Sequence, residues 1–367
     1  MSSRVAVFCR TFLPRSQTFV YDAVTRLTRY RATVFCKERD EGAQFPFDDV
    51  RVGWPGYAAT RISPNFVAAF LRERFDVIHA QFGPSAIYAL PYARLARLPL
   101  VVSFHGYDVP LLDQARPIRG PHRQYAWFGR AMLRRMTLGL CASEELRQML
   151  IAHGVAQERL RTHTLGVDTR RFRPGVRSPG PARVLMIGRF VEKKGFRYGI
   201  EAFARAASRD AQLTIIGEGP LDEALRTLTQ ELGIAARVDF TGPLTHAQVL
   251  ERMRDHDILL APSVVAANGD RDSGLIVLRE AAACGLVPIA SRMGGLPDSV
   301  EDGETGFLTE MRDVDQLSER LQRLLCDAAL RTRMSLASRD KMVREMDHSL
   351  AMPQLERAYD DARATFG

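Results

Sequence analysis

Residues 257–285 read DILLAPSVVAANGDRDSGLIVLREAAACG, and this stretch decides the fold class of the chain. The apolar run 258–261 predicts a buried strand, and the Pro and Ser that follow predict its end. After a polar loop, Asp272 and Ser273 precede a second apolar run, which predicts a helix that starts near Asp272 with these two residues as its cap. A strand, a loop and a helix in this order form one unit of a parallel α/β sheet.

The start of such a helix attracts anions, because its first backbone N–H groups are unpaired and the helix dipole is positive there. Asp272 and Glu280 are eight residues apart, a little over two helical turns, so we expect both carboxylates on one side of the helix. They can accept hydrogen bonds from hydroxyl groups of a molecule whose phosphate lies at the helix start. A sugar nucleotide has this shape, with a diphosphate between a ribose and a hexose.

The same residues resemble the retaining glycosyltransferases of family four. The resemblance rests on the acids Asp272 and Glu280, separated by seven residues, and on four motifs that follow: AAACG at 281–285, PIAS at 288–291, GGLP at 294–297 and DGETGF at 302–307. Asp272 stands where the family usually has Glu, and Gly274 lies two residues after this acid rather than three. The Asp-Ser-Gly-Leu variant is similar to the branch that acts on bacterial polysaccharides.

The resemblance implies an α/β fold of the GT-B type, with two Rossmann-like doubly wound domains facing across a cleft. It implies a metal-independent retaining hexosyltransferase that works in the synthesis of bacterial cell-surface polysaccharide or glycoconjugate. The donor would be a nucleotide-diphosphate sugar, with UDP- and GDP-sugars ranked first, and the acceptor a saccharide or a lipid-linked saccharide. No cofactor is expected.

Two other kinds of function stay open. A GT-B sugar-nucleotide epimerase or phosphorylase would keep the fold but change the reaction. A catalytically silent sugar-nucleotide-binding protein would bind the donor without turnover. This alternative stays open because Asp stands at position 272 and Gly274 is displaced from the family position. A nicotinamide dehydrogenase is disfavoured because no GxGxxG motif follows the first strand of either half.

Strand and helix patterns alternate along the chain and predict a doubly wound parallel sheet in each half. The segment FRPGVRSPGP at 172–181 interrupts them. We therefore expect an N-terminal acceptor-side domain over 1–173, a linker over 174–182 and a C-terminal nucleotide-sugar-binding domain over 183–350. Residues 351–367 are expected to form a helix that crosses back to the N-terminal domain, as the resemblance implies.

The net charge of +8 is unevenly divided along the 367 residues. Residues 1–180 hold 27 Lys and Arg against 14 Asp and Glu, a net of +13, whereas residues 181–367 hold 24 against 29, a net of −5. The basic half is therefore expected to meet an anionic partner. Nucleic acid is disfavoured because no nucleic-acid-binding module is recognisable.

The cysteines and the apolar runs bear on the compartment. Five scattered cysteines without a CxxC pair indicate a reducing compartment and speak against a disulfide scaffold or a zinc site. No signal peptide is visible, and no apolar run approaches the roughly 20 residues that span a bilayer. We expect a cytoplasmic protein, with peripheral contact at the inner face of the plasma membrane as a further option.

Donor-side residues follow from the resemblance and from their places at strand ends. Arg189 and Lys194 lie in the loop GRFVEKKG at 188–195, where two cations can clamp a diphosphate and stabilise the charge of the leaving group. Glu280 is expected to bind the ribose hydroxyls, and Asp272 a hydroxyl of the transferred sugar. The remaining donor-side positions are main-chain contacts to phosphate or base, at Gly217, Pro243, Leu244, Gly274, Leu275 and Ile276.

The N-terminal half offers fewer candidates. His105 ends a buried strand before a Gly and matches a family His that contacts the transferred sugar, although a structural histidine is the alternative. Asp108 either orients this loop, which ranks higher, or binds acceptor. Further acceptor-side candidates, matched more loosely, are Ser16, Gln17, Thr18 and Gln81.

Two other segments of this half lead to expectations. Residues 114–135 mix cationic positions with Tyr125, Trp127 and Phe128. They either dock on anionic lipid or hold a lipid-linked pyrophosphate, or they form a solvated Arg-rich face whose aromatic side chains pack inward. Residues 38–62 are polar and punctuated by Gly and Pro, which predicts irregular structure.

Overall fold

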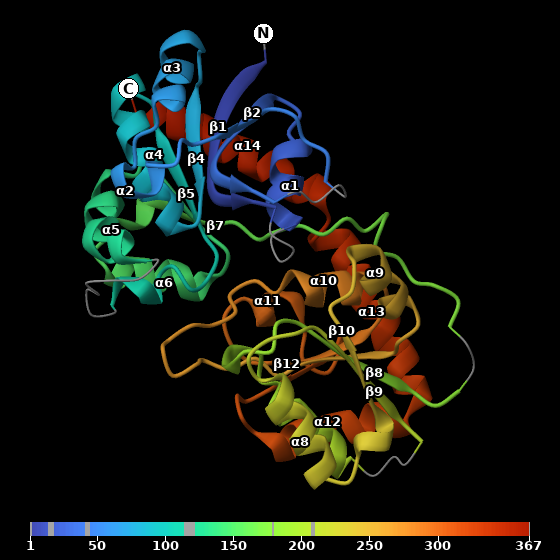
Figure 1. The fold of residues 1–367 in the computed structure, drawn as a ribbon. Helices are drawn as coiled ribbons and strands as arrows, with labels where there is room; N and C mark the ends of the chain where they lie inside the picture. The colour runs from blue at the N-terminus through green and yellow to red at the C-terminus, as the bar shows by residue number, and fades with distance from the viewer. Residues whose placement is uncertain are drawn as a thin grey trace. The chain divides into compact units, whose positions relative to one another are not determined.

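The computed structural model describes residues 2–13, 18–40, 45–113, 122–177, 180–206 and 210–366. The chain divides into two compact units (Figure 1). Unit 1 comprises Met1–Leu165 and Ser349–Gly367, and unit 2 comprises Gly166–His348. The segment 174–182, which the sequence analysis assigns to a linker, therefore falls inside unit 2.

Unit 1 is built on a seven-stranded parallel sheet in the order β3-β2-β1-β4-β5-β6-β7. Its strands are β1 (Ser3–Phe12), β2 (Tyr30–Arg39), β3 (Val50–Val52), β4 (Val77–Gln81), β5 (Leu100–Phe104), β6 (Leu138–Cys141) and β7 (Leu160–Thr162). Its helices are α1 (Thr18–Thr25), α2 (Tyr57–Thr60), α3 (Pro64–Arg72), α4 (Gly83–Ala96), α5 (Arg123–Arg135), α6 (Glu144–Ala152) and α14 (His348–Thr365). The prediction of irregular structure over 38–62 is wrong where β3 and α2 form.

Helices cover both faces of this sheet. Successive residues of a strand face opposite sides, so β1 contributes to two cores. Val5 and Val7 pack with α1 and α14, whereas Ala6 and Phe8 pack with α3, α4 and α5. The chain's last helix thus completes one face of the first unit (Figure 1).

Polar contacts fix α14 in place. The buried carboxylate of Glu356 accepts hydrogen bonds from the backbone N–H groups of Thr28 at 2.6 Å and Arg29 at 2.7 Å. The hydroxyl of Tyr359 lies 2.7 Å from Nδ1 of His79, a buried residue of β4. These contacts anchor the helix to the sheet and to the loop before β2.

Unit 2 is built on a six-stranded parallel sheet in the order β10-β9-β8-β11-β12-β13. Its strands are β8 (Arg183–Ile187), β9 (Gln212–Ile216), β10 (Val238–Gly242), β11 (Ile258–Ala261), β12 (Val287–Ser291) and β13 (Phe307–Thr309). Its helices are α7 (Phe196–Arg205), α8 (Asp222–Glu231), α9 (His246–Arg254), α10 (Ile276–Ala283), α11 (Leu296–Ser299), α12 (Val314–Cys326) and α13 (Ala328–Glu345).

Both sheets have the Rossmann strand order, in which the first strand lies between the second and the fourth. The order reverses between β8 and β11 in unit 2, and ligands of such sheets bind outside the carboxyl ends of the strands at this switch point. The strand predicted at 258–261 is confirmed as β11. The fold therefore predicts that a ligand binds at the loops that follow β8 and β11.

The predicted start of the helix after β11 is wrong. Helix α10 begins at Ile276 and its cap residue is Leu275, whereas Asp272 and Ser273 lie in the preceding loop. The turn at Gly294 and Gly295 packs against this loop so closely that a Cβ on Gly294 would lie 2.3 Å from the carbonyl oxygen of Asp272. Asp272 and Glu280 consequently do not share one helix face.

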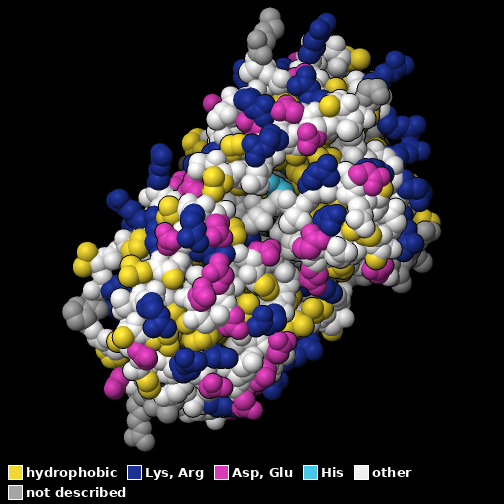
Figure 2. Space-filling model, turned by 180° about the vertical axis from the view of Figure 1, so that it is seen from behind, with side chains coloured by type: hydrophobic (Ala, Val, Ile, Leu, Met, Phe, Trp, Pro, Cys, Tyr) yellow, Lys and Arg dark blue, Asp and Glu magenta, His cyan; other side chains and the backbone are white. Residues whose placement is uncertain are grey.

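The surface reflects the uneven charge of the sequence. Figure 2 shows one face of the molecule, and on it Lys and Arg side chains are numerous over unit 1, in the upper part of the view. The described part of the chain has no helix that is both long and apolar enough to cross a membrane.

Candidate functional site

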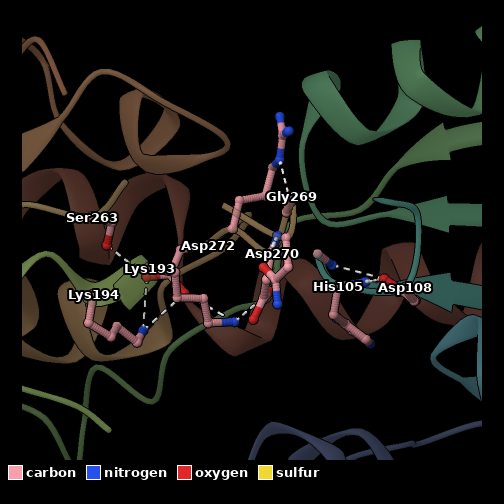
Figure 3. Close-up of polar contacts among 11 residues, drawn as sticks. His105, Asp108, Lys193, Lys194, Ser263, Gly269, Asp270 and Asp272 are labelled. Carbon is pink, nitrogen blue, oxygen red and sulfur yellow. Dashed lines mark hydrogen bonds and ion pairs between the residues drawn. The ribbon is translucent and has the colours of Figure 1, made fainter. Parts of the chain in front are cut away.

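The carboxylate of Asp272 is the centre of a charged cluster beside the switch point of unit 2 (Figure 3). Lys194, in the loop after β8, places its Nζ 3.0 Å from Oδ1 and 2.9 Å from Oδ2. The hydroxyl of Ser263, just after β11, donates to Oδ2 at 2.7 Å. Lys193 lies 3.9 Å from Oδ1 and pairs more closely with Asp270, at 3.0 Å. The two loops at the switch point are thus joined by ion pairs.

The cluster fixes the charge of Asp272, whose side chain is 8% exposed. Burial acts to raise the pKa of this carboxyl, but Lys194 and Lys193 attract the carboxylate and Ser263 donates to it, so that the pKa lies below its usual range. Asp272 is therefore ionised at neutral pH. It can accept a hydrogen bond or stabilise positive charge, and it has no proton to donate.

Glycines allow the loop after β8 to approach its neighbours. Gly195 has a φ of +61°, and a Cβ there would lie 1.8 Å from the carbonyl oxygen of Pro262. Gly217, after β9, has a φ of +143°, and a Cβ there would lie 1.9 Å from the carbonyl oxygen of Gly188. Its N–H donates to the carbonyl of Gly242 at 3.1 Å. The carboxyl ends of β8, β9, β10 and β11 therefore meet through backbone contacts at these glycines.

Arg189 lies in the same loop with a different environment. Its side chain is exposed, and among the described residues its guanidinium has no hydrogen-bond or ion-pair partner. Lys194, by contrast, is held by Asp272. Of the two predicted phosphate-binding cations on this loop, Lys194 is therefore ion-paired with Asp272, whereas Arg189 is unpaired among the described residues.

Glu280 lies on α10 and its side chain is 8% exposed. Its Oε1 lies 3.2 Å from Nε2 of His246, the first residue of α9, and Nδ1 of His246 lies 3.0 Å from Nη2 of Arg171. Neither His246 nor Arg171 is among the residues predicted from the sequence. His246 follows the loop after β10, so its place at a strand's carboxyl end was a signal that could have identified it.

The main-chain candidates of unit 2 fall into two groups. Pro243 is exposed and Leu244 half-buried in the loop after β10, whose Gly242 also contacts Gly217. Gly274, Leu275 and Ile276 are half-buried at the start of α10. The first N–H groups of a helix have no acceptor within it, so this segment offers donors to an anion.

In unit 1, His105 follows β5 and its ring lies between those of Phe19 and Phe82, with centroid separations of 4.7 and 4.6 Å. Its Nε2 contacts Oε1 of Gln81 at 2.9 Å. Its Nδ1 is buried and has no partner among the described residues. Burial lowers the pKa of His105 to about 3, so the ring is neutral at physiological pH and Nδ1 can bond a hydroxyl group.

Asp108 organises the loop around His105 (Figure 3). Its buried carboxylate accepts hydrogen bonds from the backbone N–H groups of His105 at 3.2 Å, Gly106 at 3.0 Å and Gly83 at 3.0 Å. Burial raises its pKa to about 6, although these hydrogen bonds act in the opposite direction. The geometry corresponds to the loop-orienting role.

The remaining candidates of unit 1 are described only in part. Ser16 and Gln17 lie outside the described residues, and Thr18 begins α1 with a side chain that is not described. Residues 114–121 also lie outside the described part. In α5, Tyr125 is buried, but Trp127 and Phe128 are 52% and 41% exposed. The expectation that the aromatic side chains of this segment pack inward is therefore correct for Tyr125 only.

Known families match both halves of the chain. Residues 16–171 match the family described as Glycosyltransferase Family 4, and residues 168–341 match the one described as Glycosyl transferases group 1. Both matches include the loops described above: the first covers His105 and Asp108, and the second covers the cluster around Asp272.

Two relatives are similar in sequence. WcaL of Escherichia coli, named as a colanic acid biosynthesis glycosyltransferase, is 30% identical over 68% of this chain and 61% of its own length. The chain thus matches about three fifths of that relative. A GDP-mannose-dependent alpha-(1-6)-phosphatidylinositol monomannoside mannosyltransferase of Mycobacterium tuberculosis is 30% identical over 92% of this chain and 93% of its own length.

A solved structure shares the fold. HepE of Anabaena, crystallised in complex with UDP, superimposes with a TM-score of 0.77 over 98% of this chain and 100% of its own, at 17% sequence identity. At this identity the likeness shows the fold alone.

Proposed function

This chain belongs to the family-four glycosyltransferases of the bacterial polysaccharide type, and from that premise we propose that it transfers a hexose from a nucleotide-diphosphate sugar to a saccharide acceptor with retention of configuration. The proposal needs no metal ion. HepE binds UDP and the mycobacterial relative is GDP-mannose-dependent, so UDP- and GDP-sugars are the first donors to test.

The observation that carries the proposal is the cluster around Asp272. The guanidinium of Arg189, which has no partner in the described part of the chain, and the ammonium of Lys194 supply positive charge in the loop after β8, where the diphosphate of a donor would lie. The first N–H groups of α10 add donors for the same phosphates. These groups act on the charge that develops as the leaving group departs, and electrostatic stabilisation is most effective there.

The proposed step breaks the bond between the anomeric carbon and the phosphate oxygen and forms a bond from that carbon to an acceptor hydroxyl on the same face. The acceptor proton passes to the departing phosphate oxygen. The ionised Asp272 would stabilise the positive charge on the sugar and accept a hydrogen bond from one of its hydroxyl groups. In unit 1, the neutral His105 has a ring nitrogen that can accept a hydrogen bond from a hydroxyl group. No residue needs to act as a nucleophile.

Glu280 and His246 would hold the nucleoside. The carboxylate of Glu280 accepts hydrogen bonds and suits the two hydroxyls of a ribose, while His246 fixes its orientation at 3.2 Å. The backbone near Gly217, Pro243 and Leu244 would contact the base.

Thermal unfolding without metal, against UDP-, GDP-, ADP-, TDP- and CMP-sugars, tests the donor. A ligand that binds only the folded state raises Tm by mass action. We expect one nucleotide class to raise Tm, and Glu280→Ala to abolish the shift. Glu319→Ala is the matched control, because Glu319 is an exposed acid on α12 of the same unit.

Two outcomes would count against the proposal. If no sugar nucleotide at millimolar concentration shifts Tm, the donor assignment fails. If a donor binds but is isomerised without an acceptor, or is never turned over with any saccharide, the epimerase or the silent binding protein replaces the transferase.

A further proposal concerns the membrane. Trp127 and Phe128 are exposed on α5 beside Arg130 and Arg134, and Arg61 stacks on the ring of Phe128 at 4.0 Å. Exposed aromatic and cationic side chains suit the interface of an anionic bilayer. Co-sedimentation with vesicles containing phosphatidylglycerol, compared with phosphatidylcholine alone, tests this contact, and equal pelleting with both would contradict it.

A further inference from the structure

Unit 1 contains a pocket of about 320 Å³ at the carboxyl ends of β1 and β2. Its floor is apolar and includes Phe8 and Ile87, and tyrosines of α2, α4 and α5 form its walls. Ligand pockets in proteins measure roughly 300–1,000 Å³, so the volume suits a group the size of one sugar unit. In sheets of this kind the carboxyl ends of the strands are where ligands bind.

Among the described residues, those that line the pocket and carry a charge are all cationic. They are Arg10 at the end of β1, Lys37 in β2 and Arg123 at the start of α5. Lys37 pairs with the carboxylate of Glu38, outside the pocket lining, whereas Arg10 is exposed and has no ion-pair partner among the described residues. Burial raises the pKa of Tyr88, which forms part of the pocket wall. The positive charges of Arg10 and Lys37 act to lower that pKa, so their field reaches the wall.

Two polar atoms just beneath the pocket lining lack partners among the described residues, and neither is open to solvent. Tyr125 is 1% exposed, and its hydroxyl has no hydrogen-bond partner among the described residues. The absence of a side chain at Gly83 leaves room for it, since a Cβ there would lie 2.3 Å from the hydroxyl oxygen. Gln124 donates from Nε2 to the carbonyls of Ala58 and Ala59, but its Oε1 is likewise unpartnered.

A pocket with tyrosine walls and an apolar floor suits the ring of a sugar, whose faces are apolar and whose edges carry hydroxyl groups. Cations at the rim would pair with a negative charge on the same sugar. A purely apolar ligand would leave these cations without a counter-charge, and a cationic ligand would be repelled by them.

We propose that this pocket binds a sugar unit of the acceptor that carries a phosphate or a carboxylate. The proposal rests on the proposed function, since it specifies the acceptor class of that glycosyl transfer. It makes the acceptor an anionic saccharide rather than a neutral one.

Calorimetric titration of the full chain with glucose 1-phosphate, glucuronic acid and glucose tests the pocket. We expect at least one of the two acids to bind at least tenfold more tightly than glucose. The double variant Arg10→Gln/Lys37→Gln should remove that difference, and it replaces side chains that are not part of the core. Ala59→Trp, at an exposed position of the lining, should weaken the bound acid by steric filling without a change of charge.

Arg94→Gln is the control, because Arg94 is an exposed cation in the last turn of α4, the helix whose first turn lines the pocket. Preference for the phosphate or for the carboxylate identifies the group on the acceptor. Equal affinity for glucose and both acids, or acid binding that survives both pocket variants, overturns the proposal. The donor-induced rise in Tm is measured on the same samples: if it persists, only the pocket assignment fails, and if it is absent as well, the proposed function itself fails.

Discussion

At the residue scale, the central finding is that Asp272 is an ion-paired carboxylate of a loop and not the cap of a helix. The sequence predicted that Asp272 and Lys194 matter, but it could not predict that they touch, because 78 residues separate them. An Asp-Ser pair before an apolar run is a frequent helix start, and here the long-range ion pair and the packing of Gly294 displace that start to Ile276. His246 could not be predicted for the same reason, because its partner Glu280 lies 34 residues away in the sequence.

Asp272→Asn should separate binding from turnover. The amide keeps the size of the side chain but loses the negative charge, so we expect kcat to fall by about 10²–10³-fold, the cost of removing one electrostatic group from an active site. Nucleotide binding, read from the Tm shift, should remain. Asp270→Asn, which alters a neighbouring carboxylate paired with Lys193, should keep kcat within a few-fold.

The pH profile offers a second check on Asp272. Because its pKa lies below the usual value of 3.8, protonation of this carboxyl should not produce a loss of activity between pH 5 and pH 7. A loss in that range that disappears in Asp272→Asn would contradict the assigned charge state.

At the element scale, the sequence predicted long apolar strands well and short exposed elements poorly. Strand β11 has the predicted bounds because its four residues are all buried and apolar. Strand β3 is Val-Arg-Val, three residues long and largely exposed, so its alternation is too short to identify a strand. Its place is set by pairing with β2, which no local signal in 38–62 reveals.

Helix α14 gives a prediction for stability against pH. Burial acts to raise the pKa of Glu356, but hydrogen bonds from Arg29 and Thr28 lower it below its ordinary value of 4.5. A carboxyl whose pKa is lower in the folded state stabilises the fold above the unfolded-state value, and that stability is lost as the pH falls through the folded-state value. The Tm of unit 1 should therefore decrease as the pH is lowered below about 4.5.

Glu356→Gln should lower the Tm of unit 1 at pH 7 and flatten its decline below pH 4.5. Glu158→Gln, at an exposed acid of the same unit, should do neither. Thermal unfolding followed by circular dichroism measures both effects. A decline of the same slope in Glu356→Gln would show that other groups cause it.

At the scale of the whole molecule, the sequence predicted two doubly wound domains because strand and helix patterns restart after a Pro- and Gly-rich segment. The division lies at Leu165 and Gly166, before that segment. Contacts made by the intervening residues explain its place: Arg339 of α13 donates to the carbonyls of Thr169 at 2.8 Å and Phe172 at 2.7 Å. Such long-range contacts have no signature in the composition of a linker.

Truncation after His348 should unfold unit 1 and spare unit 2. It removes α14, whose Leu355, Tyr359 and Ala362 are each at most 1% exposed in the core beside α1. Calorimetry should then show the transition of unit 2 without that of unit 1. A truncation after Arg363, which removes only residues beyond this core, should keep both transitions, and retention of both in the longer truncation would refute the role of α14.

The return of α14 to unit 1 also governs how the protein is made on the ribosome. Residues 1–165 are synthesised before unit 2, but the strand faces that α14 covers stay uncovered until α14 itself has been synthesised. At about 5–20 residues per second, the delay is on the order of 10–40 s. Over that time an apolar face of a nascent sheet stays open to chaperones or to neighbouring chains. Stalled nascent chains that end before α14 should therefore be cut by protease within unit 1, while unit 2, once outside the exit tunnel, resists.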